Sequence, residues 1–141
     1  MTRIDFYVLS GHDANGRALL ACRLAEKAFQ HGHRVYIHTE SAAQSRHMDE
    51  LLWTFRAGSF VPHGLREQAE QVPVVISDSG EPDSHTGVLI NLAPDVPLFF
   101  SRFARVAELV DQNDAQLRTG RERYRFYKER GYELASHKLN G

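Results

Sequence analysis

The sequence of this 141-residue chain alternates between short β-rich runs and amphipathic helical patterns, and this alternation constrains its fold more than any other feature. The opening run, Arg3 to Leu9, mixes β-branched and aromatic residues and ends at a Ser-Gly turn, which is typical of a strand. The next, Arg17 to Gln30, has apolar residues at helical spacing, and Gly32 ends the pattern. We predict further strands at Arg34 to His38, Val72 to Ile76 and Val88 to Leu92, and further helices from the N-cap Ser41 to about Phe55, from Phe99 to Val110 and from Gln116 to Arg130.

Short strands that alternate with helices favour a parallel sheet, because each parallel connection crosses over and its helix covers a face of the sheet. We therefore predict the α/β class: a single three-layer α/β/α domain over residues 1–141, with a largely parallel central sheet and Rossmann-like topology. The length, together with a hydrophobic content of 42%, is sufficient for one buried core without disulfides or structural metals.

The composition limits the classes of protein to which the chain can belong. Its 17 Lys and Arg against 18 Asp and Glu give a net charge of −1, so electrostatic recognition of DNA or of any other partner has to be local. The single cysteine, Cys22, excludes an intramolecular disulfide and fits a buried helical position. The N-terminus lacks the apolar core of a signal peptide, and no run approaches the roughly 18 apolar residues of a membrane helix. We expect a cytoplasmic protein with no membrane contact.

The segment from Gly11 to Ala18 lies between the first predicted strand and helix and has the spacing of a phosphate-binding loop. Arg17 and Ala18 stand where such loops carry Lys and Ser or Thr, and Ala18 has no hydroxyl that could bind Mg²⁺. One interpretation is therefore a degenerate nucleotide-binding domain. The other is an ordinary strand-to-helix connection in which Gly11 turns the chain and Asp13 or Asn15 caps the helix.

Eight histidines raise the question of a metal site, and His31 and His33 lie close together at a predicted helix end. The rest of a zinc ligand set is missing, because the chain has one cysteine and no His-Glu-x-x-His pattern. For nucleophilic catalysis, Ser10 is not part of a Gly-x-Ser-x-Gly elbow, and Cys22 lies inside a helical pattern. We expect no catalytic residue, no metal site and no cofactor.

A run of bulky apolar residues between Trp53 and His63 falls in a segment that Gly58 and Pro62 indicate to be a loop. Pro62 lacks an N–H and biases Val61 toward extended geometry, so neither a long helix nor a central strand fits there. Phe60 and Val61 therefore need a hydrophobic neighbour that local structure does not supply. Two interpretations stay open: the residues anchor the loop in the core of their own domain, or they form an exposed docking surface.

Cations crowd the last predicted helix and give it a local positive charge that the near-neutral chain conceals. Helical spacing places Leu117, Arg121, Tyr124 and Lys128 along one face, with Arg118 and Arg125 beside it. Such a face suits an acidic peptide with an apolar end, since arginine pairs with carboxylates and tyrosine receives the apolar group. Single-stranded nucleic acid and a merely solvated face are the alternatives. The cations are Arg118, Arg121, Arg123, Arg125, Lys128 and Arg130.

Several segments together resemble the chi subunit family of bacterial DNA polymerase III, over essentially the whole chain. They are the opening strand from Ile4 to Leu9, Leu51 to Trp53, Ser59 to His63, Arg121 to Tyr127 and Gly131 to Leu134. In this family, one surface meets the psi subunit of the clamp-loader assembly and another binds the acidic C-terminal tail of single-stranded DNA-binding protein.

The resemblance implies a non-catalytic adaptor in DNA replication, associated with the replisome at the nucleoid, that contacts DNA mainly through its partners. It also implies a helicase-like repair protein as an alternative partner for the psi-facing surface. The psi-facing residues would be Trp53, Phe60, Val61, Pro62 and His63. The tail-binding residues would be Arg118, Arg121, Tyr124, Arg125 and Lys128, where Arg118 stands in for a basic residue that the family carries one turn before Arg121 and that is Leu117 here.

Overall fold

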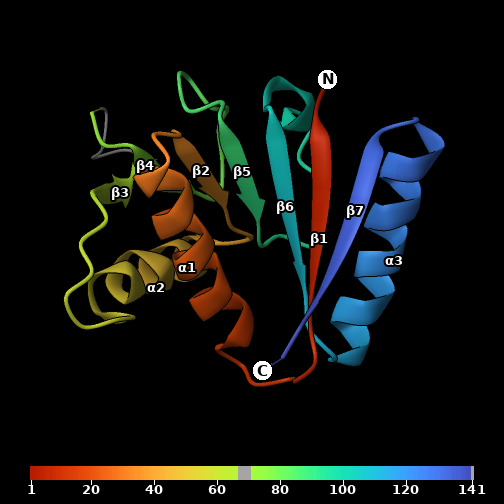
Figure 1. Ribbon diagram of the computed structural model, residues 1–141, viewed down its shortest axis with the longest axis horizontal. Helices are drawn as coiled ribbons and strands as arrows, with labels where there is room; N and C mark the ends of the chain where they lie inside the picture. Colours follow the sequence, from red (N-terminus) through yellow and green to blue (C-terminus); the bar gives the residue numbers. More distant parts are fainter. Residues whose placement is uncertain (67–70, 141) are drawn as a thin grey trace.

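The computed structural model describes residues 1–66 and 71–140, which form one α/β domain (Figure 1). Strands and α-helices alternate in the first part of the chain as the sequence predicts, whereas four strands follow α2 with no α-helix between them among the described residues. The three α-helices of the described residues are α1 (Gly16–Gln30), α2 (Ala42–Thr54) and α3 (Asp114–Glu129). The strands are β1 (Arg3–Leu9), β2 (Val35–His38), β3 (His63–Leu65), β4 (Val74–Ser77), β5 (Val88–Asn91), β6 (Arg105–Val110) and β7 (Glu133–Leu139), and a short 3-10 turn, η2 (Phe100–Arg102), precedes β6.

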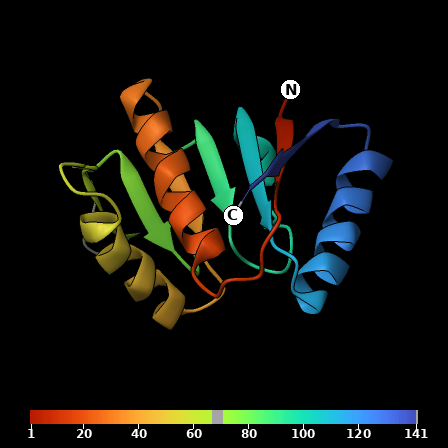
Figure 2. The same ribbon diagram turned by 60° about the horizontal axis from the view of Figure 1, so that its bottom comes forward.

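The described strands form one seven-stranded sheet in the order β3-β4-β2-β5-β6-β1-β7. Every pairing in it is parallel, from His63 beside Val74 at one edge to Arg3 beside Glu133 at the other. Figures 1 and 2 show α1 and α2 beside the half of the sheet that ends in β3, and α3 beside β7. The predicted three-layer domain with a parallel sheet and Rossmann-like topology is confirmed.

Two hydrophobic clusters hold the layers together, one on each face of the sheet. The first packs α1 and α2 on alternate residues of the strands, with Ile37, Ile76 and Ile90 at its centre. The second packs α3 and the segment around η2 on the opposite face, with Phe6, Leu89 and Tyr127 at its centre. Because both faces are covered, the central strands are apolar on both sides.

The predicted elements of the first half are confirmed to within one or two residues. Ser41 is the N-cap of α2, where its side chain accepts a hydrogen bond from the Gln44 N–H. Gly32 ends α1 at a φ of 82°, a conformation that favours glycine. Asn15 is the N-cap of α1, but its side chain makes no capping hydrogen bond.

The predicted helix from Phe99 to Val110 is wrong, because the second half of that segment is the interior strand β6 and the first half contains the short turn η2. Phe99, Phe103, Val106 and Val110 fit helical spacing, and this pattern hid a short buried strand. Its residues from Val106 to Val110 are all buried, Glu108 included, since β6 lies between β5 and β1 with both faces covered. A charged residue in a fully buried strand is explained only by its partners, which are distant in the sequence.

The two edge strands were not predicted. β3 has only three residues, and β7 reads Glu-Leu-Ala-Ser-His-Lys-Leu, a mostly polar sequence with weak alternation. Edge strands are exposed on one side and carry polar residues, so their hydrophobic signal is low. β7 nevertheless pairs with β1 over seven residues and positions α3 at that end of the sheet.

Candidate functional site

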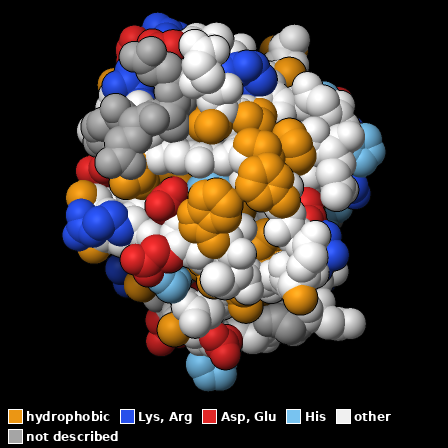
Figure 3. Space-filling view, turned by 90° about the vertical axis from the view of Figure 1, so that its left-hand side faces the viewer, with side chains coloured by type: hydrophobic (Ala, Val, Ile, Leu, Met, Phe, Trp, Pro, Cys, Tyr) orange, Lys and Arg blue, Asp and Glu red, His pale blue; other side chains and the backbone are white. Residues whose placement is uncertain are grey.

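An exposed aromatic pair lies at the β3 end of the sheet. The Trp53 side chain, near the end of α2, is 55% exposed, and Phe60, three residues before β3, is 65% exposed. Their ring centroids are 6.0 Å apart with the planes tilted by 40°. Figure 3, which views the side of the molecule that carries α2 and β3, shows hydrophobic side chains gathered into one patch. We refer to Trp53 and Phe60 as the aromatic pair.

The residues after the aromatic pair are buried and fix its position. Val61 is 1% exposed and belongs to the α1/α2-side core. The His63 imidazole has one ring nitrogen 2.6 Å from the Val61 carbonyl oxygen and the other 2.9 Å from the Asp49 carbonyl oxygen, and its ring lies 4.6 Å from that of Trp53. Both ring nitrogens of His63 therefore face backbone carbonyl oxygens. His63 thereby ties the segment to α2 directly beneath Trp53.

The two interpretations of this segment each hold for part of it. Val61 anchors the loop in the core of its own domain, and His63 is also buried, so neither offers surface for a partner. Pro62 is half-buried, whereas Phe60 points to solvent. Of the five residues that the family resemblance suggested here, Trp53 and Phe60 thus supply the exposed aromatic surface, with part of Pro62 beside them.

The loop that carries Phe60 is attached to α1 through Glu26. Arg56 forms an ion pair with the Glu26 carboxylate at 2.6 Å, and the Ser59 hydroxyl donates a hydrogen bond to the same oxygen. The pKa of Glu26 is lowered by the Ser59 hydrogen bond and, against the opposing effect of burial, by the hydrogen bond and charge of Arg56. Gly58, between these two residues, has a φ of 79°, which favours glycine. These contacts hold the loop that carries Phe60 in place.

A group of exposed cations lies on α3, at the other end of the sheet. Arg118, Arg121, Arg125 and Lys128 are all exposed, and within the described part of the chain no carboxylate pairs with any of them. Tyr124 lies among them and is half-buried, with its ring edge-on to Phe6 at 5.3 Å. We refer to these five residues as the cationic face. Its charges are free to meet an external anion, and Tyr124 is fixed by the core.

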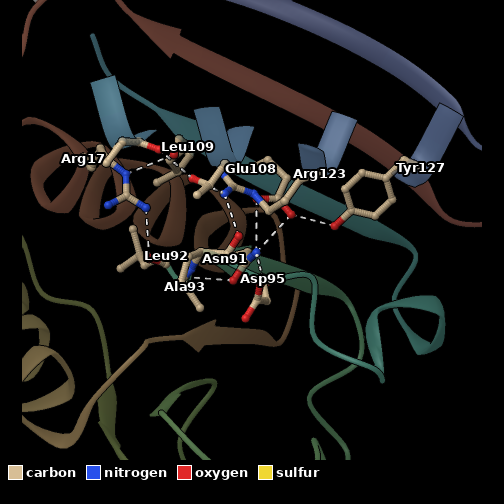
Figure 4. A network of polar contacts seen from close by, with 12 residues as sticks. Arg17, Asn91, Leu92, Ala93, Asp95, Glu108, Leu109, Arg123 and Tyr127 are labelled. Carbon is tan, nitrogen blue, oxygen red and sulfur yellow. Dashed lines mark hydrogen bonds and ion pairs between the residues drawn. The ribbon is translucent and has the colours of Figure 1, made fainter. Parts of the chain in front are cut away.

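Arg123 does not belong to that face, although the sequence grouped it with the other cations. Its side chain is 2% exposed and points into the domain, where Nε donates to Glu108 at 2.8 Å (Figure 4). The Glu108 carboxylate also accepts from the Tyr127 hydroxyl at 2.6 Å and from the Asn91 amide at 3.0 and 3.1 Å. A buried carboxylate needs such donors, and Arg123 supplies the compensating charge. Arg130 differs as well, because it stacks on the Phe126 ring at 3.6 Å.

The loop with phosphate-binding spacing is occupied by contacts within the protein. Arg17 Nε donates to the Leu109 carbonyl at 3.0 Å, and Nη2 donates to the Leu92 carbonyl at 2.9 Å, across the carboxyl ends of β6 and β5 (Figure 4). Burial lowers the pKa of Arg17, as does the neighbouring charge of Arg123. The Asp13 carboxylate accepts a hydrogen bond from the Asn15 N–H at 2.8 Å. The cation at the position of the phosphate-binding lysine is therefore directed to backbone oxygens.

The histidines and the cysteine are candidate metal ligands and nucleophiles. Within residues 1–66 and 71–140, no three His, Cys, Asp or Glu side chains come together as a metal ligand set. His31 Nδ1 lies 2.8 Å from the Lys27 carbonyl at the end of α1, the position from which a histidine interacts with the helix dipole. Burial raises the pKa of the Cys22 thiol to about 12, which keeps it protonated and poorly nucleophilic. None of the described helices has the length and apolar character needed to cross a membrane.

One polar cluster was missed by the sequence analysis. Asp5 lies in β1 with its side chain 3% exposed, and its carboxylate accepts hydrogen bonds from Arg105 and from His137, both at 2.9 Å. Burial would raise the pKa of Asp5, but these hydrogen bonds and the charges of Arg105 and Arg3 hold it below its ordinary value. The partners lie 100 and 132 residues away along the chain. The one local signal is an aspartate between Ile4 and Phe6 in an apolar strand.

Fold and surface together define a parallel α/β domain of Rossmann-like topology that presents an exposed aromatic pair and a separate cationic face at opposite ends of its sheet. Residues 1–135 match the model of the family described as DNA polymerase III chi subunit, HolC. The chain belongs to this family, whose members are accessory subunits of DNA polymerase III in DNA replication.

Sequence relatives agree with this assignment, and a solved structure shares the fold. The chain is 44% identical to DNA polymerase III subunit chi of Pseudomonas aeruginosa over 99% of its length and 98% of the relative. It is 33% identical to the chi subunit of Haemophilus influenzae, over 94% of each chain, and 33% identical to that of Escherichia coli, over 82% of this chain and 80% of that one. The crystal structure of T4 UvsW superposes on 99% of the chain with a TM-score of 0.70 at 10% identity. The chain spans 42% of that protein, and the likeness shows the fold alone.

Proposed function

We propose that this protein is a non-catalytic adaptor that binds the psi subunit through the aromatic pair and the acidic C-terminal tail of single-stranded DNA-binding protein through the cationic face. The observation that carries the proposal is the separation of two preformed surfaces of different chemistry at opposite ends of one rigid sheet. Two partners can then bind at once without competing for space. Linking two modest contacts in this way raises the overall avidity.

The aromatic pair has the properties of a binding hot spot. Trp and Phe bury about 150–250 Å² each when covered, and tryptophan is enriched among the residues that dominate interface energies. The loop of Phe60 is already fixed by Glu26 and His63, so little conformational entropy is lost on binding. A partner that presents an apolar groove or helix face fits this surface. The family resemblance names psi as that partner and a helicase-like repair protein as the alternative.

The cationic face has the chemistry of an acidic-tail site. Arg121 and Arg125 are one helical turn apart and can pair with two carboxylates of an extended peptide, one of them bidentately. Tyr124 and the half-buried Leu117 lie between the charges and offer an apolar contact to the last side chain of the tail. Arg118 and Lys128 extend the positive field along the helix.

The tail site is tested by fluorescence polarisation with a labelled acidic peptide that ends in Ile-Pro-Phe. We expect saturable binding to the wild type that weakens steeply as salt rises, because the cations are exposed and screened. Arg121→Ala with Tyr124→Ala should abolish it, and the matched control Arg23→Ala, an exposed arginine on α1, should not change it. Salt-independent binding, or full binding by the double variant, would exclude the cationic face.

The same assay includes a labelled oligonucleotide, because single-stranded DNA is the rival ligand for this face. The adaptor proposal predicts much weaker binding of the bare oligonucleotide than of the peptide. Equal or tighter binding of the oligonucleotide, lost in the same double variant, would instead identify the chain as a direct single-stranded DNA binder.

The psi-facing surface is tested with Phe60→Ala and purified psi subunit. Since Phe60 is 65% exposed, the variant should fold with unchanged thermal stability and keep tail binding, and lose psi binding by at least tenfold. Trp53 is the only tryptophan of the chain, so its fluorescence should shift to shorter wavelength when psi covers it. Unchanged psi affinity, or no spectral shift at saturation, would place the psi contact elsewhere.

A further inference from the structure

A cleft that neither surface uses lies on the α1 face of the sheet, at the amino ends of its strands. Its volume is ≈ 290 Å³. Leu24, Lys27 and Ala28 of α1 form one wall, and Tyr7 and Arg105, from β1 and β6, contribute to the other. The cationic face belongs to α3, which packs on the opposite face of the sheet, and the aromatic pair lies at the β3 edge.

The cleft contains positive groups whose hydrogen-bonding capacity is mostly unused. Arg105 donates one hydrogen bond to Asp5, and its other guanidinium nitrogens have no acceptor among the described side chains and carbonyls. The Lys27 ammonium has no carboxylate partner in the same part of the chain. The rings of His31 and His33 also line the cleft, and Nε2 of His31 has no partner there. The open end of the cleft therefore presents several donors to an external anion.

The single carboxylate of the cleft does not cancel this charge. Asp5 is already bonded to Arg105 and His137 and is approached by Arg3 at 3.4 Å, so it is compensated within the protein. Its position also orients the Arg105 guanidinium at the sheet end of the cleft. Tyr7 stacks on the His137 ring at a centroid distance of 4.8 Å and is held in place by it. The charge set is consistent with one added negative charge.

The remaining wall of the cleft is apolar. Leu24, Ala28 and Val88 are half-buried, and Ala107 is buried beneath them. Ligand sites in proteins are typically about 300–1,000 Å³ with an apolar lining and a few polar groups that orient the ligand, so this cleft is at the small end of the range. An apolar floor with cations at the rim fits a compact hydrophobic body that carries one carboxylate.

We propose that this cleft binds a small monocarboxylate with an apolar body, either a free organic acid or the C-terminal residue of a peptide. The apolar body lies against Leu24, Ala28 and Val88, and the carboxylate is held by Arg105 and Lys27. The proposal is independent of the psi and tail surfaces, so it can fail while both of those stand, or hold while either fails.

The test is a ¹H–¹⁵N NMR titration of the full chain with 3-phenylpropionate and, separately, with the peptide Gly-Gly-Leu bearing a free carboxylate. We expect saturable shifts of the Lys27, Ala28 and Arg105 amides with at least one of the two. Saturation by the free acid alone identifies an organic-acid site, and tighter binding of the peptide identifies a C-terminus site. No saturable shift at the cleft with either probe overturns the proposal.

Three controls separate a built site from weak anion association. The uncharged 3-phenylpropanamide and inorganic phosphate should each bind at least tenfold more weakly, and phosphate binding as tight as that of the acid would overturn the role of the apolar body. Lys27→Gln and Arg105→Gln should each weaken the acid at least fivefold, while Arg23→Gln, on the same helix but outside the cleft, should not. Lys27 is exposed, so its variant keeps the test valid if Arg105→Gln disturbs Asp5.

Discussion

Replacing Arg123 by methionine should destabilise the domain far more than replacing any other arginine of α3. Methionine is unbranched like the arginine stem and keeps most of its volume, so the change mainly removes the guanidinium with its charge and its hydrogen bonds. The structure assigns those bonds to Glu108 at 2.8 Å, to the Pro94 carbonyl at 2.9 Å and to the Thr119 hydroxyl at 3.1 Å. After the change, the Glu108 carboxyl group has 0% exposure and has lost its ion-pair partner.

The size of the effect follows from this burial. Removing one partner of a buried ion pair costs about 3–5 kcal/mol, because the remaining charge is desolvated and uncompensated. A domain of this kind has about 5–15 kcal/mol of stability in total, so the loss is a large fraction of it. With a urea m-value of about 2 kcal/mol per M, the midpoint of unfolding should fall by about 1.5–2.5 M. Arg121→Met, on the exposed face, should move it by no more than about 0.25 M.

The measurement is urea unfolding followed by circular dichroism, with the double variant Glu108→Gln/Arg123→Met beside the single ones. Glutamine keeps an oxygen that can accept from Tyr127, but it leaves no buried charge. We therefore expect the double variant to be more stable than Arg123→Met alone by about 1–3 kcal/mol. If Arg123→Met matched Arg121→Met, or if the two changes in the double variant added without coupling, a buried ion pair at this position would be refuted.

Three shorter predictions concern other parts of the domain. Because the pKa of Asp5 is lowered from 3.8, the unfolded state binds more protons than the folded state as pH falls through that value, so the wild type should lose stability below about pH 4. Asp5→Asn should lose less stability over the same range, as measured by urea midpoints. Cys22 has a pKa raised to about 12, so a disulfide reagent at neutral pH should label it only at the rate of unfolding, and fast labelling of the folded protein would contradict its burial. At Gly120, an added Cβ would lie 3.0 Å from a methyl of Val110. Gly120→Ala should therefore lower the free energy of unfolding by about 1 kcal/mol in the wild type, and raise it in a Val110→Ala background where the methyl is absent. A double-mutant cycle measures both effects.

The sequence predicted the elements correctly where the hydrophobic periodicity of a segment matches the way in which that segment is buried. α1 and α2 each bury one face, so their 3.6-residue periodicity is visible, and Gly32 and Ser41 mark ends whose chemistry is local. The prediction for β6 was wrong because a strand buried on both faces shows no alternation of apolar and polar residues. In addition, Val106 and Val110 are four residues apart, which is also the spacing of one face of a helix. β7 was not predicted because an edge strand is exposed on one side and its sequence is mostly polar, so it gives little hydrophobic signal.

The sequence identified most residues of the two candidate surfaces, but it did not show which of their side chains face solvent. The sequence identified the cations of α3 and the bulky residues near Phe60, and the resemblance to the chi family grouped them by partner. Which of them point outward depends on contacts far along the chain: Arg123 is turned inward by Glu108, 15 residues earlier, and Val61 packs into the core while Phe60 does not. The cluster around Asp5 joins three strands, and no local pattern encodes it.

The buried pair also explains why the cationic face is arranged as it is. On the inner face of α3, Gly120 and Tyr127 are fully buried beside Arg123, and Leu117, Tyr124 and Phe126 pack against the core from the sides. Few large side chains are therefore buried deeply enough to fix the rotation of the helix about its own axis. The bond from Arg123 to Glu108 fixes that rotation, because it is satisfied only when residue 123 faces the sheet. Residues 121, 125 and 128 are then directed outward by the 100° step of the helix, and Tyr124 falls at the boundary, against Phe6. The buried Arg123 is therefore not part of the cationic face, but it determines which cations of α3 are exposed there.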